Sequence, residues 1–224
     1  MFGLISEGLF TADDFDASGK LKTSLPVPTN SSGLRPGDIK YKDMNGDGVI
    51  DAMDGTAIGG SRIPEIIYGI GINTKYKIID FGVFFQGTAK TWQILGGENW
   101  LPSQTLGAGN IFTNVDDRWM EENPSQNVFW PRLSRDALAN NSAPSTWWLK
   151  DMSFIRLKSI ELGITLPNVW TKGLGISNIR FFARGSNLLT FSKFKLWDPE
   201  LETTDGLKYP IMKSVSAGLN INFQ

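Results

Sequence analysis

A short segment near the start of the chain has the spacing of a calcium-binding loop. From Asp43 to Asp54, oxygen-bearing side chains occupy loop positions one, three, five, nine and twelve, and glycine occupies position six. Calcium prefers hard oxygen ligands at about 2.4 Å, held by a sharply turned backbone. The predicted ligands are the side chains of Asp43, Asn45, Asp47, Asp51 and Asp54 and the backbone carbonyl of Val49.

The same segment has a second interpretation that needs no metal. Asp54 replaces the usual glutamate at position twelve, and the flanking residues do not have the pattern of two helices. Asn45-Gly46 and Asp47-Gly48 are also typical of tight turns with solvated side chains. The sequence alone leaves both a calcium site and a pair of turns open.

Composition excludes several other kinds of chemistry. The chain has no Cys and no His, which removes thiol nucleophiles, disulfides and histidine bases. Asp116, Asp117, Glu121 and Glu122 could form a glycosidase pair only if two of them lay about 5–9 Å apart, and surface charges are the simpler interpretation. We therefore predict no enzyme. The net charge of -1 and scattered basic residues also argue against a nucleic-acid partner.

Aromatic residues gather in the segment 88–150. Flat aromatic faces stack on sugar rings or pack against partner proteins, so this segment is predicted to contact a ligand or a partner. The alternatives are that these side chains form a membrane-interface girdle or pack the loop upon itself. The six tryptophans concerned are Trp92, Trp100, Trp119, Trp130, Trp147 and Trp148.

Strands must position these loops, and strict period-two alternation marks several of them. In the last strand, predicted at 212–223, the odd positions from Val215 onward are apolar and the even positions from Ser214 onward are small or polar, which suits lipid on one face and a wet lumen on the other. An edge strand of a soluble sheet would show the same pattern. The apolar positions are Val215, Ala217, Leu219, Ile221 and Phe223.

About six strands are expected in all. Residues 66–76 and 81–87 predict a hairpin, and the other strands are predicted at 2–10, 159–166, 179–191 and 212–223. The connections alternate between long and short, as the extracellular loops and periplasmic turns of outer-membrane barrels do. The first residues do not form a secretory signal and no apolar run reaches about 18 residues, so we expect a downstream part of a longer polypeptide that crosses the membrane as strands. The predicted fold is all-β, an antiparallel transmembrane β-barrel segment.

Several short motifs follow one another over nearly the whole chain. They are Gly37 to Asp43, Asn45 to Gly48, Tyr68-Gly69, Phe81 to Gly87, Phe154 to Ile160, Leu162 to Pro167, Asn187 to Phe191 and Asp198-Pro199-Glu200. With these motifs the chain resembles the SusC/RagA family of TonB-dependent outer-membrane transporters, in which they recur in the same order, so the resemblance is specific.

The resemblance implies that residues 1–224 are the C-terminal portion of a barrel of roughly 22 strands, with long extracellular loops at 11–63 and 88–150. Strand 212–223 would close the barrel by pairing with a first strand outside this sequence. The implied partners are a SusD-like surface lipoprotein, the TonB complex through a missing N-terminal part, an oligosaccharide or peptide substrate, and the outer-membrane lipid of a Bacteroidetes-like Gram-negative bacterium. The alternative is a soluble, secreted β-sandwich that binds glycan and is stabilised by a calcium loop.

Overall fold

The computed structural model describes residues 1–97, 112–134, 138–170, 173 and 175–223. The chain divides into two units, each assembled from segments far apart in the sequence. The sheet unit comprises Ile63–Thr91, Asp151–Leu201 and Lys208–Gln224, and the loop unit comprises Met1–Arg62, Trp92–Lys150 and Glu202–Leu207. No helix in the described part of the chain is both long and apolar enough to cross a membrane.

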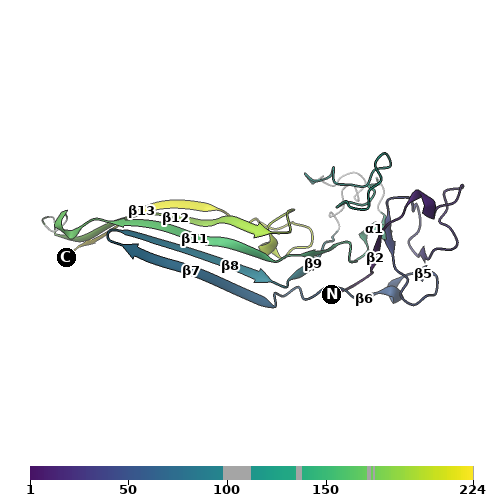
Figure 1. Cartoon of the computed structure of the whole chain (residues 1–224), viewed down its shortest axis with the longest axis horizontal. Helices are drawn as coiled ribbons and strands as arrows, with labels where there is room; N and C mark the ends of the chain where they lie inside the picture. The colour runs from purple at the N-terminus through teal and green to yellow at the C-terminus, as the bar shows by residue number, and fades with distance from the viewer. Residues whose placement is uncertain (98–111, 135–137, 171–172, 174, 224) are drawn as a thin grey trace. The chain divides into compact units, whose positions relative to one another are not determined.

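Five long strands form the sheet of the sheet unit in the described residues (Figure 1). Every neighbouring pair is antiparallel, and the spatial order is β13-β12-β11-β8-β7. The sheet is open, with β7 and β13 as its edges. The strands are β7 (Ile66–Tyr76), β8 (Ile79–Ala89), β11 (Phe154–Thr165), β12 (Ile176–Ser192) and β13 (Ser214–Phe223), and the short helices η3 (Asn168–Trp170) and η5 (Pro199–Leu201) lie in their connections.

The hairpin predicted from period-two alternation is confirmed. β7 covers the predicted residues 66–76, and β8 pairs with it along its whole length, from Ile66 opposite Ala89 to Tyr76 opposite Ile79. Lys77, in the tight turn between them, has a φ of 53°. The strand predicted at 2–10 is wrong as a sixth member of the sheet, because these residues form two short strands within the loop unit.

A β-bulge interrupts the regular pairing of β11. The register of β11 against both neighbours shifts between Leu157 and Ser159: Lys158 is an extra residue against β8, whereas the extra residue on the other side belongs to β12. On the β12 side the same irregularity includes Asn187, whose φ of 54° lies in the left-handed region. The bulge explains why the alternation in the sequence begins only after Lys158.

The loop unit contains short strands that pair mostly across long sequence separations. β1 pairs with β6, β2 with β4, β3 with β5 and β9 with β10, and only β3 and β5 are shown to be parallel. The elements are β1 (Phe2–Gly3), β2 (Ser6–Leu9), η1 (Ala12–Asp14), β3 (Val27–Pro28), β4 (Ile39–Tyr41), β5 (Val49–Ile50), η2 (Ala52–Asp54), β6 (Thr56–Ala57), β9 (Trp92–Ile94), α1 (Ala139–Ser142) and β10 (Leu149–Asp151).

The loop unit has its own hydrophobic core. Phe10, Ile39, Leu95, Trp130 and Trp148 are all buried. These side chains come from both of the segments predicted as long loops, so the two segments fold together rather than separately.

A close approach in the loop unit requires glycine. Gly37 has a φ of 88°, and a Cβ there would overlap the ring of Trp119. Its N–H donates to the carbonyl of Phe10, and its carbonyl accepts from the N–H of Arg132. The residues on either side of Trp119 form isolated β-bridges, Arg118 with Trp130 and Met120 with Asn123.

Candidate functional site

One face of the five-stranded sheet is apolar along its whole width. The register places alternate residues of all five strands on this face, because side chains along a strand point alternately to the two sides. Many of them are exposed, including Ile72, Leu162 and Phe181. The predicted barrel-closure residues of β13 continue the same face, since Leu219 lies opposite Phe181 and Ala217 opposite Ala183.

The opposite face is polar and carries a chain of ion pairs. Arg180 lies between two carboxylates: its guanidinium donates to Asp80, with Nε 3.0 Å from Oδ2, and to Glu161, with Nη2 2.6 Å from Oε1. Arg184 then binds the other oxygen of Glu161, 2.6 Å from Nε to Oε2. A Cβ at Gly163 would clash with both Asp80 and Arg180, so glycine lets this network lie flat on the sheet.

A second charged cluster ties the connection after β12 to the bulge in β11. Arg156 is buried and pairs with Asp198 and, 3.2 Å from Nε to Oε2, with Glu200. Lys158, the extra residue of the bulge, binds Glu200 with Nζ 2.9 Å from Oε1. Two cations that are two positions apart in β11 thus hold one acidic segment.

Buried polar groups organise the loop unit. Arg132 forms a bidentate pair with the buried carboxylate of Asp38, with distances of 3.0 Å from Nε to Oδ1 and 2.9 Å from Nη2 to Oδ2. Asn141 donates to the same carboxylate, 2.9 Å away, and accepts from the N–H of Ile39. Sequence reasoning missed Arg132 and Asn141 as partners of Asp38, because residues about a hundred positions apart leave no local signal.

In the Asp-rich loop, residues 43–54, the acidic and amide side chains accept hydrogen bonds from backbone N–H groups of the same loop. Asp43 accepts from the N–H groups of Gly46 and Gly48, Asn45 from that of Asp47, and Asp47 from that of Val49, at 2.7 to 3.0 Å. Asp51 accepts from the N–H of Met53, 2.7 Å away. These hydrogen bonds are typical of tight turns, which are the second interpretation of this segment beside a calcium site.

Asp54 ends this loop and is buried. Burial on its own would raise the pKa of Asp54, but donation from the backbone N–H groups of Asp51 and Met44 holds that pKa below its ordinary value. Within the described ranges, no group of three or more Asp, Glu, His or Cys side chains is arranged to hold a metal ion.

Calcium binding by Asp43, Asn45, Asp47, Val49, Asp51 and Asp54 stays a prediction. If the site exists, calorimetric titration of the folded protein with calcium should release or absorb heat at calcium concentrations up to about millimolar. The affinity should be weak because the site lacks the usual bidentate glutamate. Replacement of Asp47 by Asn should reduce that heat, since it removes one charged ligand. A titration without heat at millimolar calcium would leave only the turn interpretation.

The structure separates the predicted tryptophans into two groups. Trp130 and Trp148 have no exposed surface, so they pack the core of the loop unit rather than present a face to a ligand. Trp92, Trp119 and Trp147 are partly exposed. Trp100 lies outside the described residues.

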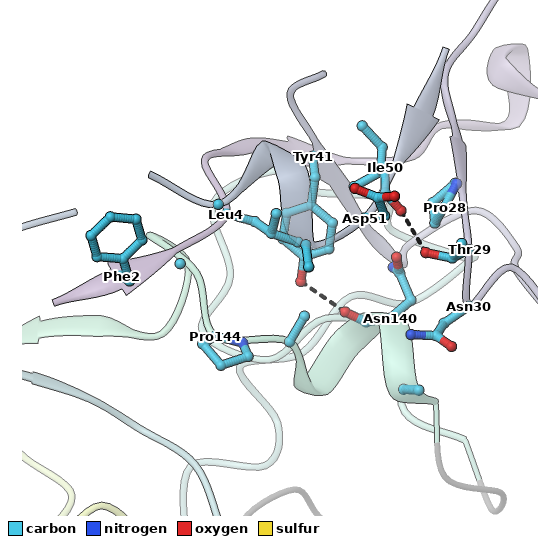
Figure 2. Close-up of a pocket in the computed structure, with 15 residues that line it drawn as sticks. Phe2, Leu4, Pro28, Thr29, Asn30, Tyr41, Ile50, Asp51, Asn140 and Pro144 are labelled. Atoms are coloured by element: carbon cyan, nitrogen blue, oxygen red, sulfur yellow. Dashed lines mark hydrogen bonds between the residues drawn. The ribbon is translucent and has the colours of Figure 1, made fainter. Parts of the chain in front are cut away.

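A pocket of about 370 Å³ lies within the loop unit (Figure 2). The hydroxyl of Tyr41 donates to the carbonyl of Asn140 at 2.8 Å, and that of Thr29 donates to the carbonyl of Ile50 at 2.8 Å. Burial raises the pKa of Tyr41, so its hydroxyl stays protonated. Asp51, from the Asp-rich loop, also lines the pocket.

Comparison with known proteins shows which family the chain belongs to. The chain is 33% identical over 214 residues to TonB-dependent receptor P26 of Formosa agariphila, covering 87% of this chain and 21% of that protein. The chain belongs to the SusC/RagA family of TonB-dependent receptors. A second family member, TonB-dependent receptor SusC of Bacteroides thetaiotaomicron, is 24% identical over 197 residues, covering 84% of this chain and 18% of that protein. No protein-family model matches the chain.

Solved structures of the family share this fold. The RagAB peptide importer in its open-open state aligns with a TM-score of 0.67 and 22% identity, covering 100% of this chain and 22% of the other. The antiparallel sheet thus matches part of a family barrel, although its described strands do not close. The chain spans about a fifth of the length of the curated relatives that it matches. Receptors of this family are transporters of the bacterial outer membrane, not enzymes.

Proposed function

We propose that this chain forms the C-terminal part of the barrel of an outer-membrane TonB-dependent transporter. The two-faced sheet is the observation that carries this proposal. Its apolar face exposes large side chains on every strand, and its other face is lined by ion pairs. Lipid would cover the first face and a water-filled lumen would hydrate the second.

The open edges of the sheet support the same proposal. A strand edge in lipid must have all its backbone N–H and C=O groups paired, so β7 and β13 each need a further strand. We propose that strands outside this sequence pair with both edges of a barrel of roughly 22 strands. The closing strand β13 would then present Val215, Ala217, Leu219, Ile221 and Phe223 to lipid.

The loop unit is proposed to lie outside the cell and to contact a SusD-like surface lipoprotein. Two features support this role: the loop unit has its own core, and it is built from the long connections 1–62 and 92–150. Among the predicted tryptophans in the described residues, the partly exposed Trp92, Trp119 and Trp147 are proposed to contact a ligand or partner, and Trp100 stays a prediction. The imported substrate is proposed to be an oligosaccharide or a peptide, and the TonB complex would act through a part of the protein absent from this sequence.

The alternative of a soluble β-sandwich has less support. A sandwich needs a second sheet packed over the apolar face of the first. In the described residues, the remaining sheets have two strands each, and the apolar face of the five-stranded sheet is exposed.

Uptake in the native host tests the proposed function. A strain that lacks the intact receptor, meaning the longer polypeptide that contains this chain, should lose growth on one class of oligosaccharide or peptide. Deletion of TonB should abolish the same uptake while leaving surface binding of the substrate. Undiminished uptake of both classes in the receptor deletion, or recovery of this chain as a water-soluble protein with cooperative unfolding, would contradict the proposal.

A further inference from the structure

In the pocket of the loop unit, polar side chains gather on one side, beside Ile50 and Pro28. Figure 2 shows Thr29, Asn30 and Asp51 toward one side of it and Phe2, Leu4 and Pro144 toward the other. These side chains come from β1, from the end of β3, from β5 and from the residues after α1, so the pocket exists only when the loop unit is folded. Its shape suits an elongated group with one polar tip and an apolar stem.

The charge of the pocket points to a cationic tip. Among the described residues that line the pocket, Asp51 is the only acidic or basic one besides the buried phenol of Tyr41. It belongs to the segment 43–54, which contains four aspartates and no Lys or Arg. Lys40, close in sequence, already pairs with Asp14, with Nζ 3.4 Å from Oδ1. The carboxylate of Asp51 thus gives the lining a negative charge that favours a cation.

We propose that this pocket binds the side chain of a lysine residue in a peptide. The ammonium would bind Asp51, and the methylene stem would pack against Leu4 and Pro144, as lysine stems do on apolar surfaces. A saccharide fits less well, because its hydroxyl groups surround the ring while most of this lining is apolar. The inference concerns binding by the loop unit and holds whether the imported substrate is a glycan or a peptide.

Titration of the intact receptor with two blocked tripeptides tests the proposal. One is acetyl-Ala-Lys-Ala-amide, and the other carries norleucine, which keeps the stem but lacks the amine. EDTA in the buffer removes calcium as a competitor for Asp51. The lysine peptide should bind roughly fivefold to tenfold more tightly than the norleucine peptide, because an ion pair with a charged hydrogen bond contributes about that factor.

Three variants assign the binding to this pocket. Asp51→Asn keeps an oxygen for the N–H of Met53 and should lower the affinity for the lysine peptide by the same fivefold to tenfold factor. Ala143→Leu fills the pocket without changing charge and should weaken both peptides. Asp13→Asn removes an exposed carboxylate of the loop unit outside the lining and should change affinity less than twofold.

Two outcomes would overturn the proposal. In the first, the lysine peptide binds wild type, Asp51→Asn and Ala143→Leu equally well, which would place the binding elsewhere on the receptor. In the second, maltotriose binds the wild type but not Asp51→Asn, and the lysine peptide binds neither. The pocket would then be a saccharide site. Ala143→Leu leaves the hydrogen bond from the N–H of Met53 to Asp51 intact. The test therefore does not depend on the correct folding of Asp51→Asn alone.

Discussion

Replacement of Arg132 by Met is expected to destabilise the loop unit by about 3–5 kcal/mol. The variant leaves the buried carboxylate of Asp38 without its cation, and the remaining donors, the side chain of Asn141 and the N–H of Arg35, do not neutralise it. The free energy of local opening should fall accordingly. Hydrogen exchange of the intact receptor would show this as a loss of protection of roughly two to four orders of magnitude at Gly37 and Ile39.

The double variant Asp38→Asn/Arg132→Met provides the matched control. It removes both charges, so part of the protection lost in the single variant should return, because no unpaired ion is left buried. Amides in β11 and β12 should keep wild-type protection in both variants, since those strands belong to the sheet unit. Equal protection of the loop unit in wild type and Arg132→Met would show that the ion pair does not stabilise it.

The long strands of the sheet were predictable from local sequence because their two faces differ. β7 agrees with its predicted bounds, and the alternation in residues 159–166 predicted the second half of β11. The first half was hidden by the bulge at Lys158, which shifts the alternation by one position. A bulge requires partner strands to define it, so a single-sequence pattern cannot locate it.

The loop unit could not be predicted in the same way. Its strands have two to four residues, too few for a periodic pattern to emerge. Its order comes from contacts between distant segments, such as Asp38 with Arg132, which are 94 residues apart. The same reason explains Trp130: its aromatic surface suggested a ligand contact, and only the folded unit shows that it is buried.

The Asp-rich segment shows how one motif can support two kinds of chemistry. The spacing of its oxygens predicts a calcium loop, and the structure uses the same side chains to cap backbone N–H groups. Both uses require oxygen acceptors on a sharply turned backbone, so the sequence pattern does not distinguish them. What the fold adds is the position of Asp51 in the lining of a pocket, which no spacing rule contains.

Replacement of Ile72 by Arg should destabilise the membrane-inserted receptor by about 2–4 kcal/mol. Ile72 is exposed near the middle of β7, opposite Val83 on the apolar face, so the variant would place a guanidinium in lipid. The neighbouring Asn73 lies on the polar face, and Asn73→Arg should cost less than about 1 kcal/mol because water can hydrate it there. Denaturant unfolding of the intact receptor in lipid vesicles measures both free energies.

The difference between these adjacent variants separates a membrane sheet from a soluble one. In a soluble protein, an exposed isoleucine replaced by arginine changes stability by no more than about 0.5 kcal/mol, so Ile72→Arg would be close to neutral. A large cost at Ile72 together with a small cost at Asn73 is expected when lipid covers one face of the sheet and water the other. Small and equal costs at the two positions would mean that water reaches both faces, and the barrel proposal would fail.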